Sequence, residues 1–71
     1  MNQTMSDLRN RVQAAFLEDD LLQDHGIEIL DSNGIITLRG AVPSGEARER
    51  AEDVTREVTG VTSVINEIDV V

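Results

Sequence analysis

The alternation of apolar and polar side chains predicts five elements in the order helix, strand, strand, helix, strand. Residues 6–18 and 44–58 carry apolar side chains three and four positions apart, the spacing of one helical face. Residues 27–31, 35–42 and 64–71 instead change between apolar and polar at nearly every step, as half-buried strands do. We therefore expect an α+β fold, a single small αββαβ domain with two helices packed on one face of a three-stranded mixed sheet.

Glycines and asparagines mark the breaks between these elements. The pair Asn33-Gly34 tolerates the positive φ angles of a two-residue hairpin turn. Gly40, inside a strand, predicts either a bulge or the close approach of a helix backbone to the sheet. Gly60 is expected to cap the end of the second helix. Asn66 lies on an apolar strand face, where we expect a buried amide that ties a neighbouring loop to the sheet.

The second helix is predicted to bury a narrow stripe of small side chains. Ser44 is a suitable N-cap residue, as Ser6 is for the first helix. The stripe runs at helical spacing, and the remaining helix positions, Thr55 among them, are assigned to the polar side. Its members are Ala47, Ala51, Val54 and Val58. Leu22, in the connector between the first helix and the first strand, is expected to close one end of the core.

Length and composition allow one domain without covalent or metal cross-links. The chain has 71 residues and no cysteine, which excludes disulfides and thiolate zinc sites. Phe16 is the only aromatic residue, so packed aliphatic side chains must supply the stability. We divide the chain into a flexible lead-in, residues 1–5, and a folded domain, residues 6–71.

The charge is strongly negative. The chain has fourteen Asp and Glu residues, six arginines and no lysine, which gives a formal net charge of -8. Such a surface repels phosphates, which argues against nucleic-acid binding and against attraction to anionic lipid headgroups. No apolar run is long enough to span a bilayer, and no signal peptide is recognisable. The chain is thus expected in the cytoplasm if complete, or in the cell envelope or periplasm if it is an excised domain.

Two segments of the chain carry a family pattern. Residues 33–42 form a glycine turn and an apolar, threonine-bearing strand that ends in Gly-x-Val. Residues 58–68 contain Val-x-Gly-Val-x-x-Val-x-Asn, and Leu17 and Leu22 supply spaced leucines upstream. From Leu8 onward the chain resembles the BON domain family. The resemblance implies a module of bacterial envelope and stress proteins, found beside channel, secretin, LysM or CBS domains and thought to contact phospholipids, with some members protecting against osmotic shock.

The side chains give little support to catalysis or to a bound cofactor. The serines all have cap or turn positions, and the lone His25 has no evident nucleophile to activate. Asp19, Asp20, Asp24 and His25 are candidates to gather a cation, although their spacing does not match a calcium-binding EF-hand loop. We expect neither an enzyme nor a cofactor.

Three functions remain open after these exclusions. The first is a BON-type binding module that contacts phospholipid or another protein domain. Four arginines are candidates for headgroup contacts, with surface ion pairs as the alternative: Arg9, Arg11, Arg39 and Arg48. The second is a protein-interaction or self-association module that uses sheet edges, for example at Val70-Val71. The third is a weak cation-binding domain.

Overall fold

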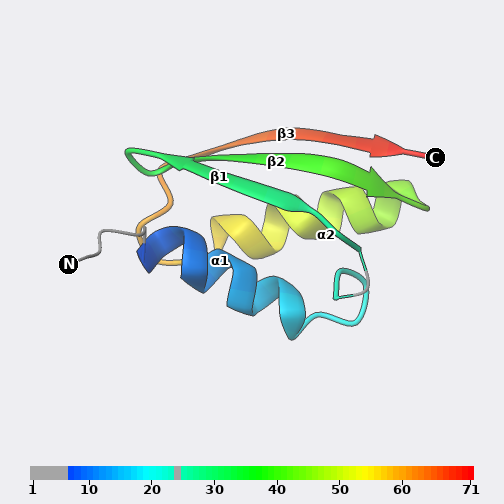
Figure 1. Cartoon of the computed structure of the whole chain (residues 1–71), viewed down its shortest axis with the longest axis horizontal. Helices are drawn as coiled ribbons and strands as arrows, with labels where there is room; N and C mark the ends of the chain where they lie inside the picture. The colour runs from blue at the N-terminus through cyan, green and yellow to red at the C-terminus, as the bar shows by residue number, and fades with distance from the viewer. Residues whose placement is uncertain (1–6, 24) are drawn as a thin grey trace.

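A computed structural model describes residues 7–23 and 25–71. The predicted lead-in, the expected Ser6 cap and Asp24 of the candidate cation cluster lie outside the described residues. The elements are α1 (Asp7–Leu17), β1 (Glu28–Ser32), β2 (Ile35–Val42), α2 (Gly45–Arg56) and β3 (Ser63–Val70) (Figure 1). The predicted order αββαβ is confirmed.

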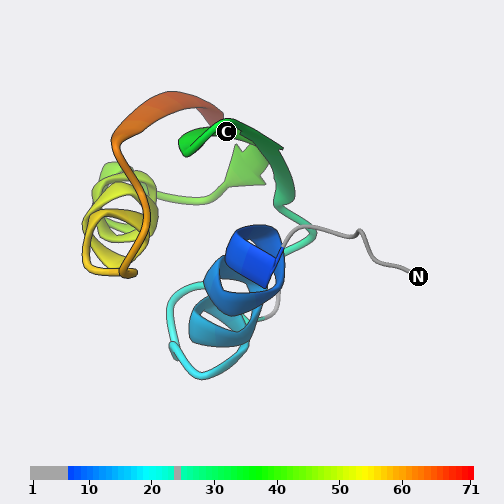
Figure 2. The same cartoon turned by 90° about the vertical axis from the view of Figure 1, so that its left-hand side faces the viewer.

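The three strands form one mixed sheet in the order β1-β2-β3. β1 and β2 are antiparallel, whereas β2 and β3 are parallel and are connected through α2. Both helices lie on the same side of this sheet, as the view in Figure 2 shows. The core lies between the two layers and consists of Val12, Phe16, Leu22, Ile29, Ile36, Leu38, Val42, Ala47, Ala51 and Ile68. The predicted layers and the predicted burial of Leu22 are both confirmed.

The hairpin between β1 and β2 has the predicted turn. Asn33 and Gly34 both have positive φ angles, 54° and 90°. The Asp31 carboxylate accepts a hydrogen bond from the Gly34 N–H at 3.1 Å, which fixes the turn from its own strand. The Gly34 carbonyl in turn accepts from the Thr62 N–H at 2.9 Å, so the hairpin also holds the start of β3.

Gly40 allows a close approach, but from a different neighbour than the sequence suggests. Its φ angle is +149°, and a Cβ atom there would lie 3.3 Å from the Ile27 Cα atom and 3.4 Å from the Gly26 carbonyl oxygen. The crowding therefore comes from the connector that enters β1. The prediction that a helix backbone approaches the sheet at this position was wrong.

The side chains that α2 buries differ in part from the predicted stripe: they are Ala47, Ala51 and Thr55. Ser44 caps the helix as expected, its Oγ accepting from the Ala47 N–H at 3.2 Å. Thr55, assigned to the polar side, is fully buried, while Val54 and Val58 are only partly buried at the margin of the core. The Thr55 hydroxyl donates to the Ala51 carbonyl at 2.7 Å, which satisfies its polar atom inside the core.

The end of α2 also differs from the prediction. The helix ends at Arg56 with Glu57 as its C-cap residue. Gly60 has a φ angle of +106° in the following turn, where a Cβ atom would lie 3.3 Å from the Leu8 side chain. Gly60 thus serves the turn that passes beside α1, and its prediction as the helix cap was wrong.

Candidate functional site

The sheet surface that faces away from the helices carries a small apolar patch. Because side chains alternate along a strand, the neighbours of the buried core residues point outward. Leu30, Thr37 and Ile65 stand side by side on the three strands, with Ile35 in the adjacent row. Leu30, Ile35 and Ile65 are 38%, 40% and 45% exposed. We call the patch formed by these four residues the open face.

Charged residues border the open face on one side. Arg39 stands between Glu28 and Glu67 in the next row of the sheet. Its Nε atom lies 2.9 Å from the Glu67 carboxylate, and both side chains are half exposed. Asp69 follows beside Ala41. Three carboxylates therefore accompany one guanidinium group on this end of the sheet surface, two of them in the row next to the apolar patch.

The outer edge of β3 is covered at its centre by Arg48 of α2. The guanidinium Nε atom donates to the Ile68 carbonyl at 2.9 Å. A second guanidinium nitrogen donates to the Asn66 carbonyl at 3.1 Å. Arg48 is thereby bound to the backbone of the strand, although the sequence suggested it as a headgroup contact.

Asn66 completes the same arrangement from the side of the strand. Its amide nitrogen donates to the Arg48 carbonyl at 3.0 Å and to the Glu52 carboxylate at 3.3 Å. Its amide oxygen accepts from the Ile68 N–H at 3.1 Å. The amide is satisfied, as predicted, but it is only partly buried and it ties a helix rather than a loop to the sheet. We call Arg48, Glu52 and Asn66 the β3 cap.

The other candidate arginines also contact acceptors within the chain. Arg9 of α1 donates from Nε to the Ile29 carbonyl of β1 at 2.9 Å. Arg11 donates to the Thr59 carbonyl at 3.0 Å and holds the turn after α2. Since Arg9 and Arg48 lie at opposite edges of the sheet and Arg39 lies on its outer surface, the four arginines do not converge on one anion.

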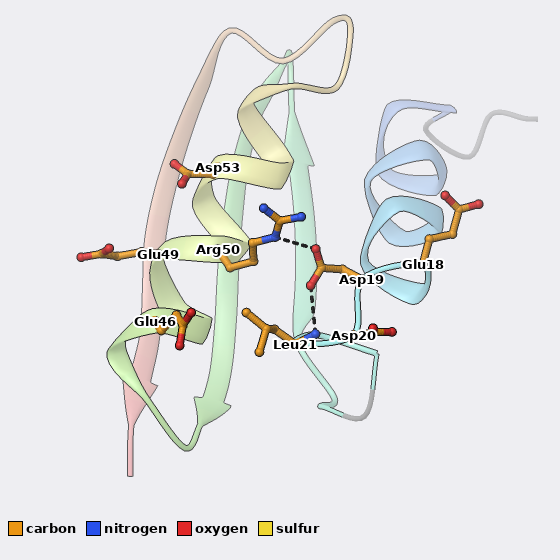
Figure 3. A pocket seen from close by; sticks show the side chains of 8 residues that line it. All are labelled: Glu18, Asp19, Asp20, Leu21, Glu46, Glu49, Arg50 and Asp53. Carbon is orange, nitrogen blue, oxygen red and sulfur yellow. Dashed lines mark hydrogen bonds and ion pairs between the residues drawn. The ribbon is translucent and has the colours of Figure 1, made fainter.

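An acidic groove of about 470 Å³ separates the connector after α1 from α2 (Figure 3). The Asp19 carboxylate crosses it, accepting from the Arg50 Nε atom at 2.6 Å and from the Leu21 N–H at 3.0 Å. The hydrogen bond between the Asp19 and Arg50 side chains and the negative charge of Asp19 raise the pKa of Arg50 above its ordinary value. The groove is lined by Glu18, Asp19, Asp20, Leu21, Glu46, Glu49, Arg50 and Asp53. Sequence reasoning missed it, because its two walls are about thirty residues apart.

The candidate cation cluster is not assembled in the part of the chain that the structure describes. Asp19 is paired with Arg50, and Asp20 accepts a hydrogen bond from the Gln23 side chain at 3.1 Å. Among residues 7–23 and 25–71, no three Asp, Glu, His or Cys side chains are placed to hold a metal ion. Within the same residues no helix has the length and apolar character needed to cross a bilayer.

Comparison with known proteins assigns the family. Residues 4–71 match the BON domain. The chain belongs to the BON domain family. This BON domain is also similar to osmotically-inducible protein Y of Escherichia coli (strain K12), with 30% identity over 59 residues. The match covers 83% of this chain and 29% of that relative, so the chain spans less than a third of the relative's length.

The positions that carry the family pattern have structural roles in this BON domain. Asn33 and Gly34 form the hairpin turn, and Gly40 admits the connector beside β2. Gly60 turns the chain past α1, and Asn66 joins β3 to α2. The pattern therefore describes how the domain folds. A binding surface has to be sought in the residues around it.

Proposed function

We propose that this BON domain is a non-enzymatic binding module of a stress- or envelope-related protein, and that it holds a partner protein against its open face. Membership of the family and the similarity to an osmotically inducible protein support the first part. The observation that carries the second is the apolar patch of Leu30, Ile35 and Ile65 on the one sheet surface that the helices leave uncovered.

The charges favour a protein over a phospholipid surface. The charged row beside the patch has Glu28 and Glu67 on either side of Arg39, which is itself paired with Glu67, and Asp69 lies one row further along the sheet. A net charge of -8 adds a long-range repulsion from anionic membranes. The complementary partner has aliphatic side chains at the centre of its contact surface and lysine or arginine at the rim.

A vesicle experiment separates the two partner classes. We expect no co-sedimentation of the domain with phosphatidylglycerol or cardiolipin vesicles at low salt, where electrostatic attraction is strongest. Binding to these vesicles that is lost in Arg9→Gln, Arg11→Gln, Arg39→Gln or Arg48→Gln would support the phospholipid alternative and overturn the proposal.

Protein docking is tested by photo-cross-linking in the cells that produce the protein. A cross-linking residue at position 65 should yield a protein adduct, whereas one at Gln13 on the exposed side of α1 should not. The adduct is identified by mass spectrometry and the partner is purified. Ile65→Glu should then weaken its binding by roughly tenfold or more, because the change places a charge in the apolar contact.

The control for that variant is Gln13→Glu, which adds the same charge on the helical side. If Gln13→Glu weakens binding as much as Ile65→Glu does, a general charge effect explains the loss and the open face is not the docking surface. If purified partner binds Ile65→Glu as tightly as the native domain, the proposal fails as well.

A further inference from the structure

We propose that helix arginines close both free edges of the sheet to strand addition, so that the domain remains a monomer and does not recruit partners by extending its sheet. The β3 cap closes one edge, and Arg9 closes the other. The free edge of a sheet ordinarily exposes a row of unpaired N–H and C=O groups on which another strand can form.

The register identifies the backbone groups that β3 turns outward. In a parallel pair the N–H and C=O groups of one residue point to the same side, and this side alternates along the strand. The Val71 N–H bonds to the Val42 carbonyl, which places the odd-numbered residues toward β2. Asn66 and Ile68 therefore point outward, at the middle of an edge that runs from Ser63 to Val70.

The β3 cap occupies these central outward groups. Arg48 donates to the Asn66 and Ile68 carbonyls. The Asn66 amide oxygen accepts from the Ile68 N–H. A strand that approached this edge would have to displace a guanidinium group and an amide together.

The β3 cap is fixed from α2 on two sides. The Asn66 amide nitrogen is held by the Arg48 carbonyl and by the Glu52 carboxylate. Glu52 forms an ion pair with Arg56 one helical turn later. The capping groups are thus bound to a packed helix, and they do not swing freely over the edge.

The β1 edge is short and is covered at its centre. The two-residue turn makes Ser32 and Ile35 a hydrogen-bonded pair, so Ile29 and Asp31 turn their backbone groups outward. Arg9 donates to the Ile29 carbonyl from α1. A five-residue strand with this obstruction offers an incoming strand little length to pair with.

The inference argues against the alternative of self-association through the sheet edges and does not depend on the proposed function. It is tested with Arg48→Met and the control Arg50→Met. Both changes remove one arginine from α2, but Arg50 faces the acidic groove and not the sheet. Light scattering from micromolar to millimolar concentration should show native protein and Arg50→Met as monomers. Arg48→Met should approach a twofold larger mass as its concentration rises.

Hydrogen exchange on the native domain tests the same inference without a variant. The Ile68 and Val70 N–H groups both point away from β2, but the Ile68 N–H donates a hydrogen bond to the Asn66 amide oxygen of the β3 cap. The Ile68 amide should exchange roughly tenfold or more slowly than the Val70 amide. Equal exchange of the two amides, a native domain that associates, or a folded Arg48→Met that stays monomeric would each overturn the inference.

Discussion

Gly40 of β2 lies against the backbone of the connector that enters β1. A Cβ atom there would meet the backbone of Ile27 and Gly26, which cannot rotate away as a flexible side chain can. The φ angle of +149° adds a conformational cost for any other residue. A side chain at position 40 would therefore force the connector and β2 apart by a few tenths of an ångström.

We expect Gly40→Ala to lower the free energy of unfolding by about 1–3 kcal/mol. The control is Gly45→Ala, at the first residue of α2, where a Cβ atom would meet nothing within 4 Å. That change should be neutral or stabilise by up to about 1 kcal/mol. Urea unfolding of both variants decides the point, and equal stability of the two would show that the close approach at Gly40 costs nothing.

Residue-level properties were predictable wherever they depend on neighbours in sequence. The positive φ angles of Asn33 and Gly34 and the cap at Ser44 follow from the chemistry of those residues and their immediate surroundings. Thr55 could not be assigned to the core, because the position that a helix buries depends on how it is rotated against the sheet. A threonine at the margin of an apolar stripe fits either side.

In the connector between α1 and β1, which has no regular secondary structure, one residue holds several neighbouring backbone groups in place. Asp19 accepts hydrogen bonds from the Leu21 N–H and from Arg50, and its carbonyl accepts from the Leu22 and Gln23 N–H groups. The side chain of Asp19 is only 9% exposed, whereas that of Arg50 is 53% exposed. The Asp19 side chain that makes both contacts is thus largely covered, although the guanidinium end of its ion pair remains in solvent.

We therefore expect Asp19→Asn to be tolerated better than Asp19→Ala. Asparagine keeps an oxygen that accepts from the Leu21 N–H, whereas alanine leaves that donor without its partner and should cost about 1 kcal/mol. Denaturant unfolding in low and high salt separates the two contributions. If Asn and Ala variants lose the same stability and the loss disappears in high salt, the ion pair with Arg50 dominates instead.

The elements themselves were more predictable than the contacts between them. Hydrophobic period and turn residues specify where helices and strands begin and end within a few residues. They do not specify which helix side chain reaches which strand. Arg9 and Arg48 were read as surface cations, because no local pattern shows that a guanidinium group meets strand carbonyls twenty residues away.

At the scale of the whole molecule, the carboxylates outnumber the arginines and gather unevenly. Six of them line the acidic groove with Arg50 as its one basic residue. The net charge was evident from composition, but this gathering required the packing of the connector against α2. Repulsion among the groove carboxylates opposes the contact between these two segments, and dissolved salt screens it.

The domain should accordingly become more stable as salt is added. Raising NaCl from about 0.01 M to about 0.3 M shortens the Debye length from about 30 Å to less than about 10 Å. We expect a gain on the order of 1 kcal/mol, or roughly 4–8 °C in Tm for a domain of this size. Glu49→Gln should raise Tm in low salt and reduce this response, since it removes one groove carboxylate that has no role in the Asp19–Arg50 pair.

Calcium distinguishes screening from specific cation binding. At equal ionic strength, CaCl₂ should raise Tm no more than NaCl does if the effect is screening alone. A saturable rise at submillimolar CaCl₂, with shifts confined to the amide resonances of Asp19, Asp20 and His25, would support the cation-binding alternative. A Tm that falls or does not change as NaCl is added would contradict the electrostatic argument itself, because the carboxylates would then not be repelling one another in the folded domain.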